Sequence, residues 1–389
     1  MMAAPATKAS GAKQETASLY QDPTRRLFGN GSFDQLPAVL ADLKPKSILL
    51  VLGQKSFRAS AYFSKLQEML EPYQVLETAA VPQNPTQIFV QEGIDRLKGQ
   101  SFDVTLAIGG GSVLDTAKLW NVISRQPVTD LAAYMDRTPP IAVRAPVLIT
   151  LPTTAGTGSE VTPYASLETR EKKKITIGHP ALYPSIAIID PEMTYSMPAY
   201  VSASTGFDAV SQAIESFWSV HATPFSQTHS LRALELMMRH LKTVVAAPSD
   251  AEARAAMSLG SCEAGLAIAH TKTTAVHSVS YPITAHFSVA HGHACALTLS
   301  SFIRFNAPVM KEAGLPLCRA AGARDYDDMA NQIDALMDQV RLERKLSGLG
   351  IREDGIKLIL RDGFRPDRIK NNPRPVTRED LQKILNQIR

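Results

Sequence analysis

Short apolar runs alternate with amphipathic stretches over the first half of the chain. Runs rich in Leu, Ile and Val predict buried strands over 47–52, 73–79, 102–108 and 147–151. Between them, apolar residues recur at helical spacing over 59–70, 86–97 and 113–123. This alternation of strand and helix predicts one parallel sheet with helices on both of its faces.

The pattern changes after Asp190-Pro191, where β-branched runs become rare and long helical periods take over. Apolar side chains fall on one helical face at 231, 234, 238 and 241, and another stripe runs through 333, 336, 337 and 340. We therefore expect a flexible N-terminal tail over 1–20, an α/β domain over 21–195 and an all-helical domain over 196–389. A cleft between two such domains is the usual place for a ligand.

Composition excludes several classes of protein. Apolar residues make up 44% and charged residues 20% of the 389 positions, which excludes a disordered chain. The net charge of +4 comes without a basic stripe, so we expect no nucleic-acid partner. We expect neither a membrane span, which needs about 20 apolar residues, nor a secretory signal. Three cysteines fit a reducing compartment, and we expect a cytoplasmic protein.

A glycine turn joins one predicted strand to the next predicted helix. Gly109, Gly110, Gly111 and Ser112 follow the strand over 102–108. Glycine lets the backbone approach a phosphate closely, and the N-terminus of the following helix offers free N–H groups. The turn differs from the G-x-G-x-x-G dinucleotide pattern, and a tight turn without a ligand is the alternative.

A threonine-rich loop follows the predicted strand over 147–151. Its sequence, LPTTAGTGSE over 151–160, carries several hydroxyl groups on a glycine-flexible turn. Hydroxyls donate to phosphate or carboxamide oxygens without adding charge. A hydroxyl-capped loop without a ligand is the alternative. Because both loops follow strands of one parallel sheet, we expect them at the sheet edge where such folds bind ligands.

Two separate segments carry candidate metal ligands. Asp208 and Gln212 are four residues apart in a predicted helix, so they share one face. His277 and His291 lie in a segment whose helix we expect to break near Pro282 and to return at His291. One carboxylate, one amide oxygen and two imidazoles would form a mixed site for a divalent first-row metal. Polar core residues or helix caps are the alternative interpretation.

Taken together, these motifs resemble the iron-dependent (group III) alcohol dehydrogenases over about residues 20–389. The family implies an N-terminal parallel-sheet dinucleotide-binding domain and a C-terminal helical metal-binding domain, the dehydroquinate synthase-like fold. The residues that carry the resemblance are Gly109–Ser112 with Asp115 and Lys118, Pro152–Glu160, Asp190-Pro191, Gly206–Ala209, the two histidine segments and Asn372–Arg374.

The resemblance also implies roles for particular positions. The dinucleotide would lie against Gly53, Gly110, Gly111, Ser112, Asp115, Thr153, Thr154, Thr157 and Lys174. The metal, Fe²⁺ or alternatively Zn²⁺, would be held by Asp208, Gln212, His277 and His291. Gln212 stands where the family usually has another histidine, which puts the identity of the metal in question. Tyr281 stands where many members have a histidine near the nicotinamide, and it is either a catalytic proton relay or a packing residue.

A smaller group within the family, the phosphonoacetaldehyde reductases, is similar at Ala213–Ser219, Thr271–His277 and Ser280–Pro282. This similarity implies interconversion of an aldehyde and an alcohol, with the anionic aldehyde phosphonoacetaldehyde reduced to 2-hydroxyethylphosphonate. Lys272 is the main candidate for substrate binding and catalysis, and His293 and Arg304 are further candidates for substrate binding. Helical geometry places Lys272 on a different face from His277, so an ordinary surface lysine is the alternative.

Coenzyme preference follows from the end of the first predicted strand. Gly53 stands where family members that favour NAD often have Asp, which binds the ribose 2′-hydroxyl and repels a 2′-phosphate. With Lys55 and Ser56 nearby, we expect NADP(H) to be preferred over NAD(H). Family members are commonly dimers or larger, so we expect a homodimer. Three other functions stay open: a reductase of a neutral small aldehyde, a dehydroquinate synthase-like lyase, and a binding protein without catalysis.

Overall fold

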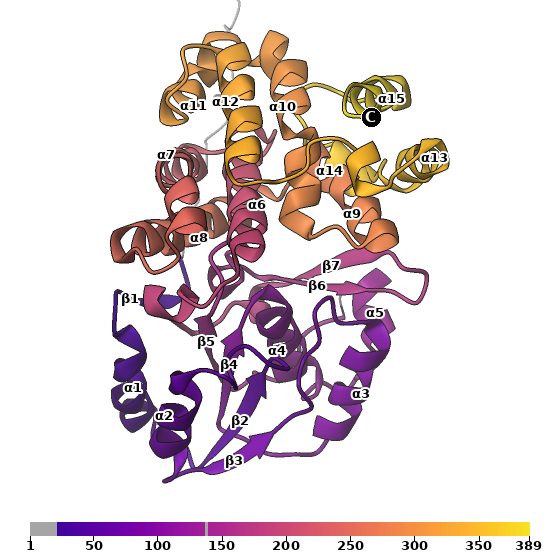
Figure 1. Cartoon of the computed structure of the whole chain (residues 1–389). Coiled ribbons are helices and arrows are strands. Elements are labelled where there is room, and N and C mark those ends of the chain that lie inside the picture. The colour runs from indigo at the N-terminus through magenta and orange to yellow at the C-terminus, as the bar shows by residue number, and fades with distance from the viewer. Residues whose placement is uncertain (1–21, 137–138) are drawn as a thin grey trace, which may run out of the picture.

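Six parallel strands form one sheet (Figure 1). Four of them lie at the predicted runs, whereas β1 and β8 were not predicted. The six strands lie in the order β1-β8-β5-β4-β2-β3, and every neighbouring pair is parallel. The computed structural model describes residues 22–136 and 139–389, so the expected tail over 1–20 lies outside the described residues. The bounds of the strands are β1 Arg25–Phe28, β2 Ser47–Leu52, β3 Gln74–Glu77, β4 Val104–Gly109, β5 Val147–Pro152 and β8 Ile186–Ile189.

Side chains of β2 alternate between two hydrophobic cores, one on each face of the sheet. Leu49 and Val51 pack with α3 and α4, whereas Ile48 and Leu50 pack with α1 and α2. Because both of their faces are buried, β2, β4 and β5 are continuous apolar runs, and this is the signal that predicted them, whereas the edge strands β1 and β3 are largely exposed. The bounds of the helices are α1 Leu36–Leu43, α2 Ala61–Leu70, α3 Gln87–Leu97, α4 Gly111–Ile123 and α5 Leu131–Asp136.

The C-terminal part of the described chain is built from helices around α6 (Ala199–Trp218), which is buried on nearly all sides. A helix of this kind belongs in the middle of a core. The sheet and the separate helical part confirm the expected fold class. None of the described helices is long and apolar enough to cross a membrane. The other bounds are α7 Pro224–Ala246, α8 Ala251–Thr271, α9 Ala275–Phe287, α10 His291–Met310, α11 Leu315–Ala320, α12 Tyr326–Gln339, α13 Glu353–Asp362, α14 Pro366–Ile369 and α15 Arg378–Gln387.

An antiparallel hairpin, β6 (Tyr164–Glu168) and β7 (Lys174–Gly178), lies between the sheet and the helical part (Figure 1). The sequence pattern did not predict it, because both strands are short and carry mixed polar and apolar residues. The hairpin contacts α9, and it brings the Nζ of Lys174 to 5.7 Å from the ring centre of Tyr281. The hairpin therefore places a positively charged side chain, that of Lys174, next to the helical domain.

The expected helix break near Pro282 is wrong. α9 continues through this residue to Phe287 and ends at Ser288, which adopts the left-handed conformation with φ 57°. A proline inside a helix removes one backbone hydrogen bond. Packing of α9 against α10 and α13 outweighs that loss, so the chain turns six residues later than expected.

Candidate active site

A cavity of ≈ 740 Å³ lies where the carboxyl ends of β2, β4 and β5 meet the helical domain. Residues predicted for the dinucleotide, the metal and the substrate line the same cavity. Those lining it are Gly53, Gly110, Gly111, Ser112, Asp115, Thr154, Thr157, Lys174, Asp208, Gln212, Lys272, His277, Tyr281 and His291.

Three of the predicted site residues are not brought to the cavity. The backbone N–H of Thr153 donates to the carbonyl of Gly109 at 3.0 Å, which ties the two loops together. His293 is buried, and its Nε2 donates to a backbone carbonyl at 2.7 Å. Arg304 lies along α10 and pairs with Asp327 and Asp334 of α12, at 3.5 and 3.9 Å. The side chains of His293 and Arg304 therefore have structural partners, and Thr153 has a structural role through its backbone.

The glycine turn and the threonine loop interlock at the edge of the sheet. α4 begins at Gly111, and a Cβ added there would lie only 2.7 Å from Cγ2 of Thr157. Glycine at this position therefore lets the threonine loop lie directly over the N-terminus of α4. Free backbone N–H groups and hydroxyls converge there, an arrangement suited to the phosphates of a dinucleotide.

Asp115 and Lys118, in the first turns of α4, hold the threonine loop in place. Asp115 accepts from the Ser159 hydroxyl at 2.6 Å and from the backbone N–H of Ser166 at 2.8 Å. Lys118 is buried and donates to the Ser159 hydroxyl and to the Tyr164 carbonyl, both at 2.8 Å. Asp115 therefore borders the cavity while its oxygens are engaged in bonds within the chain.

The carboxyl of Glu160 is buried beside this network. Burial raises its pKa to about 7, although its own backbone N–H and the charge of Lys118 act in the opposite direction. Burial likewise lowers the pKa of Lys118 to about 8, opposed by Asp115 and Glu160. The folded chain therefore binds a proton at Glu160 over a pH range in which an unfolded Glu has lost it.

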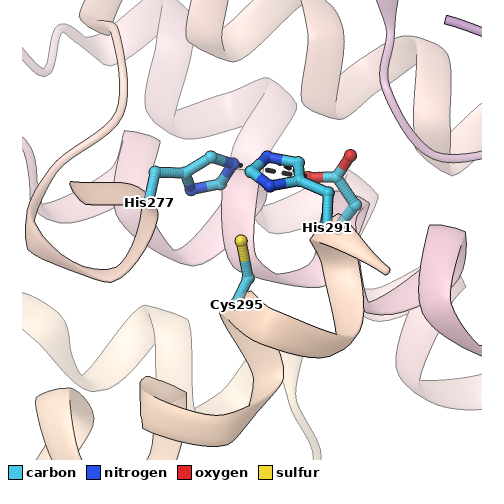
Figure 2. Close-up of side chains that lie close together, drawn as sticks. His277, His291 and Cys295 are labelled. Carbon is cyan, nitrogen blue, oxygen red and sulfur yellow. Dashed lines mark ion pairs between the residues drawn. The ribbon is translucent and has the colours of Figure 1, made fainter. Parts of the chain in front are cut away.

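The predicted metal ligands come together on three helices. Nε2 of His277 on α9 lies 3.3 Å from Oδ1 of Asp208 on α6, and Nε2 of His291 at the start of α10 lies 4.0 Å from the same oxygen. Figure 2 shows the two imidazoles facing one another, with the thiol of Cys295 directed at the gap between them. One donor atom from each of Asp208, His277, His291 and Cys295 lies within 4.8 Å of the other three.

A close approach of two backbones brings His291 to Asp208. A Cβ added at Gly292 would lie 1.8 Å from the carbonyl oxygen of Ser204 and 2.7 Å from the backbone nitrogen of Asp208. Only glycine allows α10 to begin against α6 at this distance. Burial, followed by the charges of Lys174 and His277, lowers the pKa of His291 well below its usual value. The imidazole is therefore neutral, which is the form that binds metals.

A buried carboxylate orients His277. Glu215, on α6, accepts from Nδ1 of His277, which leaves Nε2 directed toward Asp208. The other oxygen of Glu215 accepts from the backbone N–H groups of Thr274 and Val276, at 2.8 and 3.0 Å. A carboxylate that holds the second nitrogen of a histidine is the usual outer support of a metal ligand. Glu215 was not among the predicted site residues.

The fourth donor has two candidates. Gln212 lies beside Asp208, but its Nε2 faces Oδ1 of Asp208 at 3.1 Å, while its buried Oε1 has no hydrogen-bond partner among the described residues. Cys295 is buried and was missed, although it follows His291 by four residues and so shares its helix face. A carboxylate, two imidazoles, a thiol and an unpartnered amide oxygen are a donor set that fits a divalent first-row metal.

Tyr281 lies next to the predicted metal ligand His291 and also next to the cationic side chains of Lys174 and Arg365. Its ring stacks on that of His291, with centres 5.6 Å apart and an interplanar angle of 25°. Burial raises the pKa of its hydroxyl, but the positive charges of Arg368, His277 and Lys174 outweigh burial and leave the pKa lowered. Lys272 is exposed at the end of α8 and reaches the cavity from its rim.

Comparison with protein families agrees with this arrangement. Residues 23–191 match the family model "Iron-containing alcohol dehydrogenase", and residues 202–389 match "Fe-containing alcohol dehydrogenase family, C-terminal". The two matches cover the sheet domain with its glycine turn and the helices with the metal cluster. The chain therefore belongs to the iron-containing alcohol dehydrogenase family and is an oxidoreductase of the class that acts on CH–OH groups.

Several relatives match along most of their length. A long-chain-alcohol dehydrogenase of Geobacillus thermodenitrificans is 30% identical, over 92% of this chain and 93% of its own. A phosphonoacetaldehyde reductase of Streptomyces viridochromogenes is also 30% identical, over 85% of this chain and 87% of its own. The crystal structure of a sulfoacetaldehyde reductase from Bifidobacterium kashiwanohense, in complex with NAD⁺, superposes with a TM-score of 0.88 at 32% identity, over 95% of this chain and 98% of that one.

Substitution of Cys295 distinguishes the two candidates for the fourth donor. We expect the Co²⁺-loaded protein to show a near-ultraviolet thiolate-to-metal charge-transfer band, which Cys295→Ser removes, because a thiolate is a strong ligand for soft and borderline ions. Cys262→Ser, at a buried thiol away from the cluster, is the control and should keep the band. Absence of the band from the unmodified protein would assign the fourth position to Gln212 or to a solvent molecule, and a band that survives in Cys295→Ser would show that another thiol binds the metal.

Substitution of Glu160 should change how stability depends on pH. Because the folded pKa is raised, the contribution of this group is intact below the unfolded pKa of about 4.5 and is lost as the pH rises through about 7. Relative to the unmodified chain, Glu160→Gln should therefore gain ~1–3 kcal/mol of unfolding free energy between about pH 5 and pH 7.5. Urea unfolding at both pH values measures this gain. The exposed Glu312→Gln is the control, and an equal gain there would contradict the assignment.

Proposed function

We propose that this chain is a metal-dependent, NAD(P)H-linked reductase of a small anionic aldehyde, with phosphonoacetaldehyde, reduced to 2-hydroxyethylphosphonate, as the candidate substrate. The observation that carries the redox part is the position of the Asp208, His277 and His291 cluster in the same cavity as the glycine turn and the threonine loop. The substrate class is supported by the relatives named for phosphonoacetaldehyde and sulfoacetaldehyde, two small aldehydes that each bear an oxyanion.

Some residues of the site would bind the metal, and others orient those ligands. When bound, the metal polarises a carbonyl as a Lewis acid and the nicotinamide donates a hydride. Asp208, His277 and His291 would hold the metal, and Glu215 keeps the imidazole of His277 in the orientation that a ligand needs. Tyr281, beside His291, is the candidate to hold the proton that an alcohol product takes up.

The end of β2 supports a preference for NADP(H). Gly53 lines the cavity together with Lys55 and Ser56, and none of the described residues 52–56 at this strand end is an acid that would repel a 2′-phosphate. The three cysteines are buried free thiols, in keeping with a reducing, cytoplasmic location. We propose a homodimer because members of the family are commonly dimers or larger. Size-exclusion chromatography with light scattering tests this oligomeric state.

A coupled assay of the Fe²⁺-loaded protein tests the function. We expect steady oxidation of NADPH with phosphonoacetaldehyde or sulfoacetaldehyde at a higher kcat/KM than with propanal or lactaldehyde. Preference for propanal would instead favour a reductase of neutral aldehydes, which the long-chain-alcohol relative suggests. Absence of net coenzyme oxidation with all four aldehydes would contradict the proposal and would favour a dehydroquinate synthase-like lyase.

Removal of Asp208 should abolish both metal retention and turnover. Asp208→Ala deletes the carboxylate that both histidines face, so bound iron should fall from about one per chain to near zero, with turnover lost in parallel. Elemental analysis and circular dichroism check metal content and folding. Asp334→Ala, on α12 outside the cavity, is the control. Full activity in Asp208→Ala would show that the metal site has been misplaced.

A carboxylate introduced at Gly53 should reverse the coenzyme preference. The position tolerates a side chain, since its added Cβ would meet Cγ2 of Val113 at 3.4 Å, an ordinary contact, and its φ is not in the left-handed region. Gly53→Asp should lower kcat/KM for NADPH by about tenfold or more and raise the ratio of NADH to NADPH use. Gly53→Asn, of the same shape without charge, is the matched control. A strong preference of the unmodified enzyme for NADH would contradict the argument.

A further inference from the structure

The cavity holds an excess of positive charge beside Tyr281. Lys174 places its Nζ 5.7 Å from the ring centre of this residue, and Arg365 places its guanidinium carbon 5.4 Å from it. Arg368, on α14, lines the cavity and interacts with the Tyr281 side chain. One carboxylate, that of Asp367, approaches both arginines, at 3.4 Å from Arg365 Nε and 3.8 Å from Arg368 Nε. The two arginines therefore share one acidic side chain, which is itself 53% exposed.

The three cations differ in the hydrogen bonds and ion pairs that they make within the chain. Arg365 donates to the backbone carbonyl of Lys174, and its own N–H donates to the Ser278 hydroxyl at 3.0 Å, so it links β7, α9 and the start of α14. Arg368 is different, because its side chain is only 11% exposed and its buried Nε has no hydrogen-bond partner among the described residues. Lys174 has no ion-pair partner among those residues. The ion pair of Arg368 with the half-exposed Asp367 is long, at 3.8 Å, and leaves the buried Nε available to an anion that also faces Lys174.

We propose that Arg368 and Lys174 form the site that binds a tetrahedral oxyanion, sulfonate or phosphonate, on the substrate aldehyde. The guanidinium fork matches two oxygens of such a group, and the ammonium supplies a second charge. This inference rests on the proposed function and names the residues that would select its substrate.

The ring of Tyr281 links this subsite to the metal cluster. It stacks on the ring of His291, with centres 5.6 Å apart, and Nζ of Lys174 lies 5.7 Å from the centre of the Tyr281 ring. The oxyanion would meet Arg368 and Lys174, and the carbonyl would face the metal cluster. The phosphates of the coenzyme would lie at Gly110 and Gly111, at the start of α4.

Kinetics of Arg368→Gln test the proposal directly. With the Fe²⁺-loaded enzyme and NADPH, kcat/KM for phosphonoacetaldehyde and sulfoacetaldehyde should fall by about 10- to 100-fold, mainly through KM. The value for propanal should fall less, because a neutral substrate loses only what depends on the contact of Arg368 with Tyr281. Arg368→Lys should recover part of the loss, since it restores the charge without the fork. Whichever anionic aldehyde has the lower KM identifies the oxyanion.

Two controls separate the site from a general effect of charge. Lys370→Gln removes an exposed cation two residues further on and should leave both kinds of substrate unaffected. Lys272→Gln, at the exposed rim, should raise KM for the anionic aldehydes less than Arg368→Gln does. An equal loss with propanal and with the anionic aldehydes in Arg368→Gln would overturn the proposal and leave Arg368 as a residue that only positions Tyr281.

A binding measurement keeps this result separate from the redox function. Ethylphosphonate and ethanesulfonate carry the oxyanion but no carbonyl, so calorimetric titration reports the subsite alone. We expect binding to the unmodified protein, with affinity lowered about tenfold or more in Arg368→Gln. If no aldehyde is reduced but these anions bind through Arg368, the proposed function fails and the subsite stands. If aldehydes are reduced and neither anion binds, the subsite fails alone.

Discussion

The buried carboxylate of Glu215 is the interaction on which the helical half of the site depends. A carboxylate without partners in a protein interior costs several kcal/mol, and the first backbone N–H groups of a helix are likewise unsatisfied unless something accepts from them. In this structure the two groups satisfy one another, because the Glu215 carboxylate on α6 accepts hydrogen bonds from the backbone N–H groups of Thr274 and Val276 at the N-terminus of α9. The positive end of the α9 dipole adds to this attraction.

The same carboxylate couples the stability of the fold to the chemistry of the site. Glu215 also holds Nδ1 of His277, and Asp208 lies about two helical turns earlier on the same helix. α6 therefore supplies both a candidate metal ligand, Asp208, and the group that orients the neighbouring candidate, His277. α10 reaches the cluster by another route, since Gly292 lets its first turn lie against the backbone of α6. The donors thus sit on three rigid helices, and a functional site on such elements is held more precisely than one on loops.

The sequence predicted the elements with strong local signals and missed those that arise from tertiary contact. β2, β4 and β5 were predicted because strands buried on both faces are continuous apolar runs, whereas the β6–β7 hairpin has no such run. Pro282 misled the prediction of α9, because packing outweighs the loss of one helical bond. Asp208, His277 and His291 were found through motif order and do lie together. Glu215 and Arg368 carry no local signal, since their importance depends on which helix end or cavity they face.

The metal cluster and the proposed substrate site lie on different helices and strands, which explains how one fold can serve different substrates. Relatives named for a long-chain alcohol and for phosphonoacetaldehyde are each 30% identical to this chain. The metal cluster is built on α6, α9 and α10, deep in a shared hydrophobic core where substitutions are costly. Lys174 and Arg368 lie on β7 and on the short α14 and border the cavity, and of the described residues of these two elements only Ile369 belongs to that core. Charge at these two elements can therefore change while the geometry of Asp208, His277 and His291 is preserved, so substrate choice and redox chemistry are physically separable in this fold.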